Sequence, residues 1–137
     1  MKVIESENPL DVVLRYYSAL SEHNIEKIIE MFPEHTDWHV PGNKFLAPWL
    51  GTRTTRDQVR EFFELLWHST ETVSATIDHI AVIENVVISS GSFATRMLKT
   101  QKVYKSLFFT EITIVEGLIV KYKLLEDTYD LVMALGK

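Results

Sequence analysis

Histidine side chains titrate near neutral pH, so they are the first candidates for proton transfer in this sequence. His39 follows Trp38 in a short segment of alternating polar and apolar residues, and an imidazole there could act as a proton shuttle. The same alternation places Trp38 and Val40 on one face of a strand and turns His39 to the other. His79 lies within a longer strand-like segment, where we expect a partly buried structural histidine. Trp38 and Val40 are therefore the expected pocket residues of the first segment.

Several reactive groups are absent from the sequence. It contains 0 cysteines, which excludes disulfides, thiolate metal ligands and a cysteine nucleophile. The histidines do not have metal-ligand spacing with a carboxylate on one helix face, so we expect no metal. We find no glycine-rich phosphate loop, serine nucleophile elbow or dinucleotide fingerprint, and we expect no cofactor.

Aromatic residues come from every part of the chain and could converge on one apolar cavity. They are Trp38, Phe45, Trp49, Phe63, Trp67 and Phe108. Ligand pockets are typically apolar with a few placed polar groups, but aromatic residues also fill ordinary cores. We expect Trp38 and Phe63 near the pocket and Trp67 more buried in packing. Arg96 could pair with a pocket acid or bind an anionic ligand, or it could be solvated at the sheet surface.

Helices that could position these residues are predicted by apolar spacing and by capping residues. Asn8 and Pro9 mark a first helix, and Asn24 begins a second that Pro33 ends. A third helix starts at Thr55, with Gln58 in capping-box spacing. We expect a strand at 36–40 and a loop from there to Thr55.

From Thr72 the apolar period changes to two, which predicts strands at 73–83, 86–99, 103–115 and 118–126. Residues 84–85 and 116–117 have the character of two-residue hairpin turns. A last short helix, capped by Asp127 or Thr128, runs through Leu135.

The strand at 103–115 is apolar on both faces, although an antiparallel sheet usually has one polar face. One face carries Phe108, Thr110 and Ile112, which we expect to line the pocket. The opposite face carries Leu107 and Phe109, and another protein surface must shield these apolar side chains from water. We therefore expect a homodimer through the convex face of the sheet.

Length and composition fit one domain over residues 1–137, because 137 residues with 46% apolar side chains can bury one sizeable core. The net charge of −5 and the scattered basic residues argue against nucleic acid as a partner. Apolar runs are too short to span a membrane, and the first residues lack the apolar core of a signal peptide. We expect a cytoplasmic protein without membrane partners.

Four stretches resemble ketosteroid-isomerase-like and SnoaL-like proteins, in family order and spacing. They are VVLRYYSALSEHNIEKIIEMF, TDWHVPG, WLGTRTTRDQVREFF and ITIVEGLIVKYKLLEDTYDLVMAL, which together span nearly the whole chain. The resemblance implies an α+β, cone-shaped roll. In this nuclear-transport-factor-2-like (cystatin-like) fold, three N-terminal helices pack on a curved mixed, mainly antiparallel sheet.

The resemblance also implies roles for individual residues. Tyr16 stands where ketosteroid isomerases place an oxyanion-binding tyrosine, and Thr110 falls near their second donor. Val40 occupies the position of their general base and cannot take a proton, so steroid isomerisation is not expected. Leu98 likewise replaces the aspartate that epoxide hydrolases pair with an arginine at the position of Arg96.

SnoaL-like cyclases keep an aspartate at the end of the last long strand, and Asp127 matches it. A desolvated carboxylate there would have a raised pKa and could serve as a general acid or base. Alternatively, Asp127 caps the last helix, because strict alternation groups it with Lys121 and Lys123. Our first hypothesis is therefore that this protein binds a small hydrophobic molecule and catalyses proton transfer on it with Asp127. The alternative is a non-catalytic dimeric binding or adaptor module.

Overall fold

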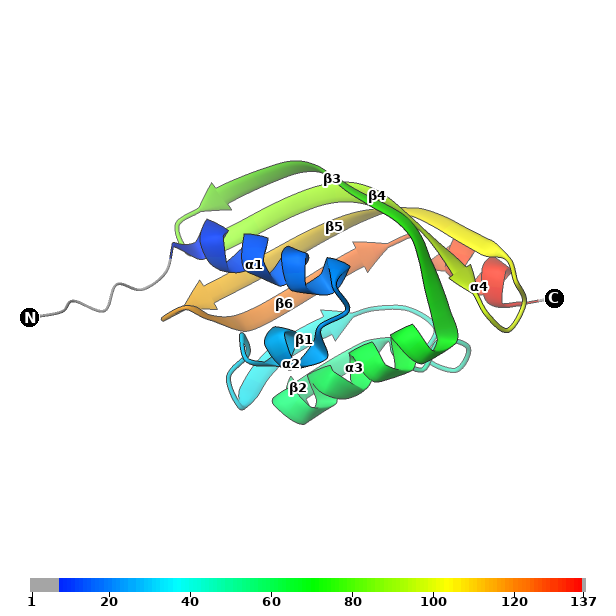
Figure 1. Cartoon of the computed structure of the whole chain (residues 1–137), viewed down its shortest axis with the longest axis horizontal. Coiled ribbons are helices and arrows are strands. Elements are labelled where there is room, and N and C mark those ends of the chain that lie inside the picture. The colour runs from blue at the N-terminus through cyan, green and yellow to red at the C-terminus, as the bar shows by residue number, and fades with distance from the viewer. Residues whose placement is uncertain (1–7, 137) are drawn as a thin grey trace, which may run out of the picture.

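The computed structural model describes residues 8–136, in which helices cover the concave side of one curved sheet (Figure 1). In chain order the elements are α1 (Pro9–Ser21), α2 (Ile25–Ile29), β1 (His35–Val40), β2 (Gly51–Thr55), α3 (Arg56–Ser69), β3 (Thr70–Ile83), β4 (Val86–Met97), β5 (Val103–Val115), β6 (Leu118–Glu126) and α4 (Thr128–Leu135). The cone-shaped α+β fold expected from the sequence is confirmed.

Side chains cap the helices at the positions that the sequence indicates. The Oδ1 atom of Asn8 accepts the backbone N–H of Leu10 at 2.8 Å, and the hydroxyl of Thr55 accepts that of Gln58 at 3.2 Å. These bonds satisfy N–H groups that a helix leaves unpaired in its first turn. They set where α1 and α3 begin, and hence which of their residues face the sheet.

The sheet has the strand order β2-β1-β6-β5-β4-β3, in which β1 runs parallel to β6 and the other pairs are antiparallel. Two-residue turns join β3 to β4 and β5 to β6, as predicted. Glu116 and Gly117 have φ angles of 51° and 78°. Two successive positive φ angles are typical of hairpin turns that match the twist of the flanking strands.

Strand β2 corrects the sequence prediction, which placed a loop from 41 to Thr55. Its residues are mostly threonine, with the charged Arg53 at a buried position, so apolar alternation does not reveal it. Arg53 is only 6% exposed. Its guanidinium donates to the carbonyls of Pro48, Trp49 and Gln58 and pairs with Glu61 at 2.6 Å.

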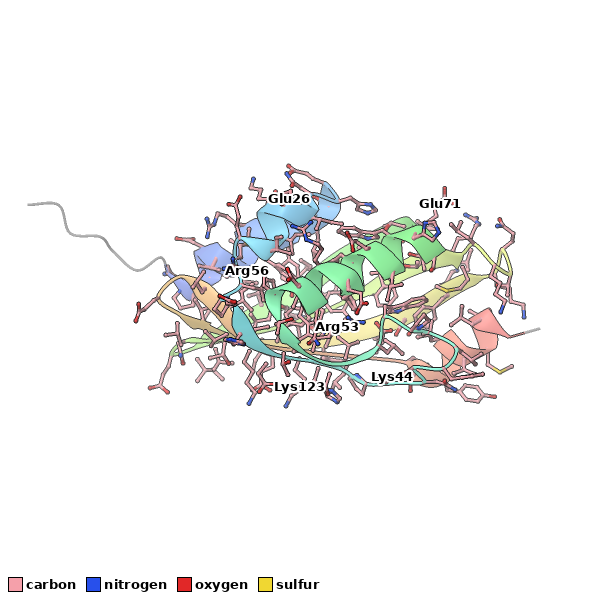
Figure 2. The ribbon with its side chains drawn as sticks, turned by 90° about the horizontal axis from the view of Figure 1, so that it is seen from below. Glu26, Lys44, Arg53, Arg56, Glu71 and Lys123 are labelled. Atoms are coloured by element: carbon pink, nitrogen blue, oxygen red, sulfur yellow. The ribbon has the colours of Figure 1, made fainter. Side chains whose placement is uncertain are left out.

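Arg53 thereby holds Pro48 and Trp49, at the end of the segment 41–50, against α3 (Figure 2). The contact matters for the site because Trp49 lies at the end of that segment.

The core lies between the helices and the inner face of the sheet. Trp38 is 0% exposed and stacks on Tyr122 with 4.1 Å between ring centroids. Along β5 the even-numbered residues face this core and the odd-numbered residues face outward. Leu107 and Phe109 therefore project from the outer face, 64% and 52% exposed.

Within residues 8–136, no helix is both long and apolar enough to cross a membrane.

Candidate active site

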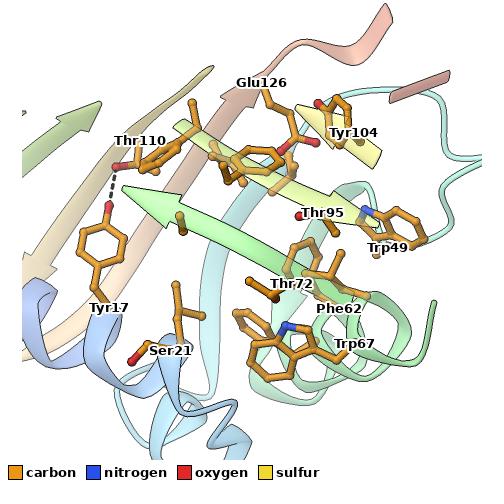
Figure 3. Close-up of a pocket in the computed structure, with 18 of the residues that line it drawn as sticks. Tyr17, Ser21, Trp49, Phe62, Trp67, Thr72, Thr95, Tyr104, Thr110 and Glu126 are labelled. Carbon is orange, nitrogen blue, oxygen red and sulfur yellow. Dashed lines mark hydrogen bonds between the residues drawn. The ribbon is translucent and has the colours of Figure 1, made fainter. Parts of the chain in front are cut away.

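A cavity of about 580 Å³ lies on the concave side of the sheet, between the sheet, α1 and α3 (Figure 3). Its wall is mostly aromatic and aliphatic. Among its polar members are Tyr17, Ser21, Thr72, Thr95, Tyr104, Thr110 and Glu126. No lysine or arginine is among the lining residues that the structure describes. The space suits an apolar molecule that carries a small number of hydrogen-bonding groups.

The exposed lining residues mark where the cavity opens. Ser21 and His23, at the end of α1, and Thr72 and Ser74, on β3, line the cavity and are solvent-exposed. At this mouth His23 stacks on Trp67, with ring centroids 4.1 Å apart. The mouth therefore lies between the end of α1 and the first half of β3. Glu126 also lines the cavity and is partly buried.

Glu126 is the acidic residue of the cavity wall. It ends β6, and alternation along that strand places it on the same face as Tyr122 and Leu124, which also line the cavity. Burial among apolar neighbours raises the pKa of Glu126 to about 7, and the nearby hydroxyl of Tyr104 offsets only part of this effect. A carboxyl group with this pKa is present in both charge states near neutral pH.

The hydroxyl of Tyr104 lies beside Glu126 but donates its proton elsewhere. It bonds the backbone carbonyl of Asp127 at 2.7 Å. With that proton engaged, the phenol gives the carboxylate less stabilisation than a free donor would. Burial raises the pKa of Tyr104 as well, so it remains neutral.

Asp127, the acid that the sequence analysis favoured, points away from this space. Its Oδ1 atom accepts the backbone N–H of Asp130 at 3.0 Å and caps α4. It is not among the residues that line the cavity. The structure thus shows the capping alternative, because a β-strand turns adjacent side chains to opposite faces.

Three hydroxyl groups meet at another part of the wall. Tyr17, on α1, bonds Ser89 at 2.6 Å and Thr110 at 2.9 Å, and Ser89 bonds Thr110 at 2.8 Å. Ser89 and Thr110 are directly paired on β4 and β5. This hydroxyl cluster, Tyr17, Ser89 and Thr110, ties α1 to the floor of the cavity.

Tyr16 lines the cavity, but its hydroxyl is fully buried and has no hydrogen-bond partner among residues 8–136. Its ring packs edge-on against Tyr122, with centroids 5.5 Å apart. Burial, followed by the neighbouring Tyr122, raises the pKa of Tyr16 well above its ordinary value. The phenol is therefore a neutral donor at physiological pH.

The other residues expected from the sequence fall into two groups. Those that line the cavity are Val40, Trp49, Phe63, Phe108 and Thr110. Trp38 and Ile112 do not line it, because they lie in the solid core. Arg96 also lies elsewhere, paired with Glu71 on the neighbouring strand at 3.2 Å.

Sequence reasoning missed Glu126, Tyr17, His23 and Trp67 as lining residues. The signal for Glu126 was available, because Lys121 and Lys123 place the odd-numbered residues of β6 outside. Nothing in the local sequence around Tyr17 distinguishes a core position from a cavity wall. His39 bonds Thr52 on the neighbouring strand at 3.0 Å and is not a lining residue.

The described part of the chain has no group of three or more His, Asp or Glu side chains placed to hold a metal ion.

Comparison with known proteins supports the same fold. A family model described as SnoaL-like domain matches residues 13–122. The search of curated proteins finds no match.

Solved structures match over nearly the whole chain. A nuclear-transport-factor-2-like protein from Burkholderia thailandensis is 18% identical, with a TM-score of 0.85, covering 96% of this chain and 99% of that one. TerC, co-crystallized with polyporic acid, is 15% identical, with a TM-score of 0.82 and coverages of 93% and 97%. A Mycobacterium tuberculosis epoxide hydrolase of the limonene-epoxide-hydrolase-like type is 11% identical, with a TM-score of 0.73 and coverages of 93% and 88%.

Proposed function

The chain belongs to the family of SnoaL-like domains, and we propose that it binds a small hydrophobic molecule in its cavity and moves a proton on it through Glu126. One observation carries the proposal. A carboxyl group on the wall of an apolar cavity has its pKa raised to about 7. A general acid or base works best when its pKa lies near the working pH, because it can then both accept and release the proton.

The proposed chemistry is proton abstraction next to a carbonyl, as in isomerisation, cyclisation or dehydration. The Glu126 carboxylate takes the proton from carbon, electron density moves to the carbonyl oxygen, and the acid returns the proton to carbon or oxygen. We assign the role of hydrogen-bond donor to that oxygen to Tyr16, since its hydroxyl proton has no partner among the described residues. Thr110 becomes a ligand-positioning residue, because its hydroxyl is already bonded to Tyr17 and Ser89.

Solvent exchange of carbon-bound protons tests this without knowledge of the natural substrate. The ketone 2-tetralone has acidic protons next to its carbonyl, and in D₂O the loss of their NMR signal measures proton transfer. We expect the protein to accelerate this exchange, and the Glu126→Gln variant to lose the acceleration. Asp127→Asn, one residue away, is the matched control and should retain it. Equal rates with wild type and Glu126→Gln would refute the catalytic proposal.

A non-catalytic binding module is the second candidate, because the cavity exists whether or not Glu126 reacts. The same experiment separates the two functions. A binding module would shift the ligand's NMR signals on titration without accelerating exchange.

We also propose that two copies of the chain pair through the outer face of the sheet. Leu107, Phe109 and Leu125 are exposed there, and Phe109 and Leu125 are direct partners on β5 and β6. An exposed apolar patch of this kind commonly marks an interface. On the same face Glu111 and Lys123 lie 3.9 Å apart, so both charges are present for a self-complementary two-fold contact. A copy bound there leaves the cavity mouth open, because the mouth is on the concave side.

A further inference from the structure

The hydroxyl cluster formed by Tyr17, Ser89 and Thr110 places a chemical condition on the ligand, and this inference rests on the function proposed above. We infer that the cavity selects molecules that present a hydrogen-bond donor, a hydroxyl or N–H group, to Tyr17 and Thr110. A carbonyl or ether oxygen at the same place is disfavoured. The predicted ligand class is thus a hydroxylated or amine-bearing apolar ring compound.

The number of hydroxyl protons in the cluster determines what it can bond. Each of the three hydroxyls carries one proton, and the three pairs lie at 2.6, 2.8 and 2.9 Å. Three hydrogen bonds need three protons, so a closed ring uses all of them, whichever way round it runs. Each oxygen keeps an unused lone pair. The cluster therefore offers acceptors to a ligand, and a ligand acceptor can be bonded only if one internal bond breaks.

The cluster is accessible from the cavity on one side only. Tyr17 and Thr110 line the cavity, as Figure 3 shows, whereas Ser89 does not. Ser89 is buried and sits behind the other two on β4. It acts as a positioning residue, because its hydroxyl accepts a hydrogen bond from one neighbour and donates one to the other without meeting the ligand.

The donor site and Glu126 are close enough to hold one molecule. Thr110 is paired with Leu124, and Glu126 follows two residues later on the same face of β6. Strand geometry separates the Cα atoms of Thr110 and Glu126 by roughly 8 Å. A bicyclic molecule can therefore present a donor to the cluster while its reactive carbon lies near the carboxylate.

The test compares two bicyclic ketones that differ at the remote end, 6-hydroxy-2-tetralone and 6-methoxy-2-tetralone. Both are titrated into methyl-labelled protein, and NMR shifts yield the dissociation constants. The Thr110 methyl signal reports whether the substituent reaches the cluster. We expect the hydroxyl compound to bind about tenfold more tightly to the wild-type protein. The reason is that it donates a hydrogen bond to the cluster, whereas the methoxy compound can be bonded only if a bond within the cluster breaks.

The decisive variant is Ser89→Ala, which changes no residue of the cavity wall. The remaining Tyr17–Thr110 bond uses one of two protons, so one proton becomes available to a ligand acceptor. We expect the tenfold preference to fall to about twofold or less, mainly because the methoxy compound gains affinity. Thr110→Val is a second variant in case Ser89→Ala is poorly folded. It also leaves two hydroxyl groups, one hydrogen bond between them and one unused proton. Ser90→Ala is the control, since Ser90 is the adjacent residue and faces outward opposite Phe109.

Equal affinity of the two ketones for the wild-type protein would overturn the inference and leave the proposed function standing. A preference that is unchanged in both variants would also overturn the inference, because the bulk of the methoxy compound's methyl group would then explain the weaker binding of that compound. If neither ketone binds, both the inference and the proposed function are rejected.

Discussion

Glu126 and Asp127 are adjacent in the sequence, yet the first lines the cavity and the second caps α4 with a 3.0 Å bond to the N–H of Asp130. Adjacent strand residues project to opposite faces, so only one of the two carboxyl groups can enter the apolar space. Under the function proposed above, Glu126 has a chemical role, whereas Asp127 has the structural role of a helix cap. Each role predicts a different response to mutation and pH.

Replacement of Glu126 by Gln should stabilise the protein at pH 8 by about 3 kcal/mol and have little effect at pH 4. In the folded protein the pKa of Glu126 is about 7, above its ordinary value of 4.5. Between these values the folded state keeps a proton that the unfolded chain releases, so wild-type stability falls as pH rises. Above pH 7 the wild-type protein has lost the full amount of folding free energy that the buried carboxylate costs. Urea denaturation at several pH values measures it, and a pH-independent difference would contradict the prediction.

Asp127→Ala should destabilise the protein by about 1 kcal/mol through loss of the α4 cap. Asp127→Asn should restore most of this stability, because Asn is also a good capping residue. Thermal unfolding monitored by circular dichroism measures both variants. Neither should reduce the acceleration of proton exchange, and a large loss in Asp127→Asn would return the catalytic role to this residue.

Arg53→Met should cost about 2–4 kcal/mol of folding stability and loosen the segment that carries Trp49. The change leaves the carbonyls of Pro48, Trp49 and Gln58 without their buried donor. Arg60→Met is the comparison, since Arg60 pairs with Glu26 at the surface and should matter far less. Denaturation shows the stability, and the NMR signal of the Trp49 indole N–H, resolved from those of Trp38 and Trp67, shows the loosening. Similar losses in the two variants would argue against a special role for Arg53.

Leu107→Lys combined with Phe109→Lys should convert a dimer into a monomer, because four charges would then meet across a two-fold interface. Sedimentation equilibrium at micromolar concentration measures the mass. Ser18→Lys adds a positive charge on the exposed side of α1 and should leave the dimer intact. A wild-type protein that is monomeric at this concentration would end the dimer proposal.

Periodicity and capping residues predict most of the fold because their causes are local. Asn8 and Thr55 mark helix starts by the bonds their own side chains make, and the hairpin turns follow from two-residue breaks in alternation. Strand β2 was missed because its buried Arg53 is satisfied by partners in the preceding loop and the following helix. No local pattern can indicate that a charged residue will be buried in this way.

The site was harder to predict because a cavity is the volume that the packed side chains leave unfilled. Trp38 and Phe63 have similar chemistry and both lie inward, but only Phe63 borders empty volume. Which of Glu126 and Asp127 enters the cavity depends on the register of one strand, where a shift of one residue exchanges the two faces. Strict alternation with Lys121 and Lys123 already indicated the answer that the structure shows.

Titration of the Glu126 carboxyl carbon by ¹³C NMR tests most directly whether this acid is poised for proton transfer, with the signal assigned by its absence in Glu126→Gln. We predict a midpoint near pH 7, because burial raises the pKa of Glu126 to about 7. A midpoint near the ordinary value of 4.5 would show that this carboxyl group is solvated and not poised for proton transfer.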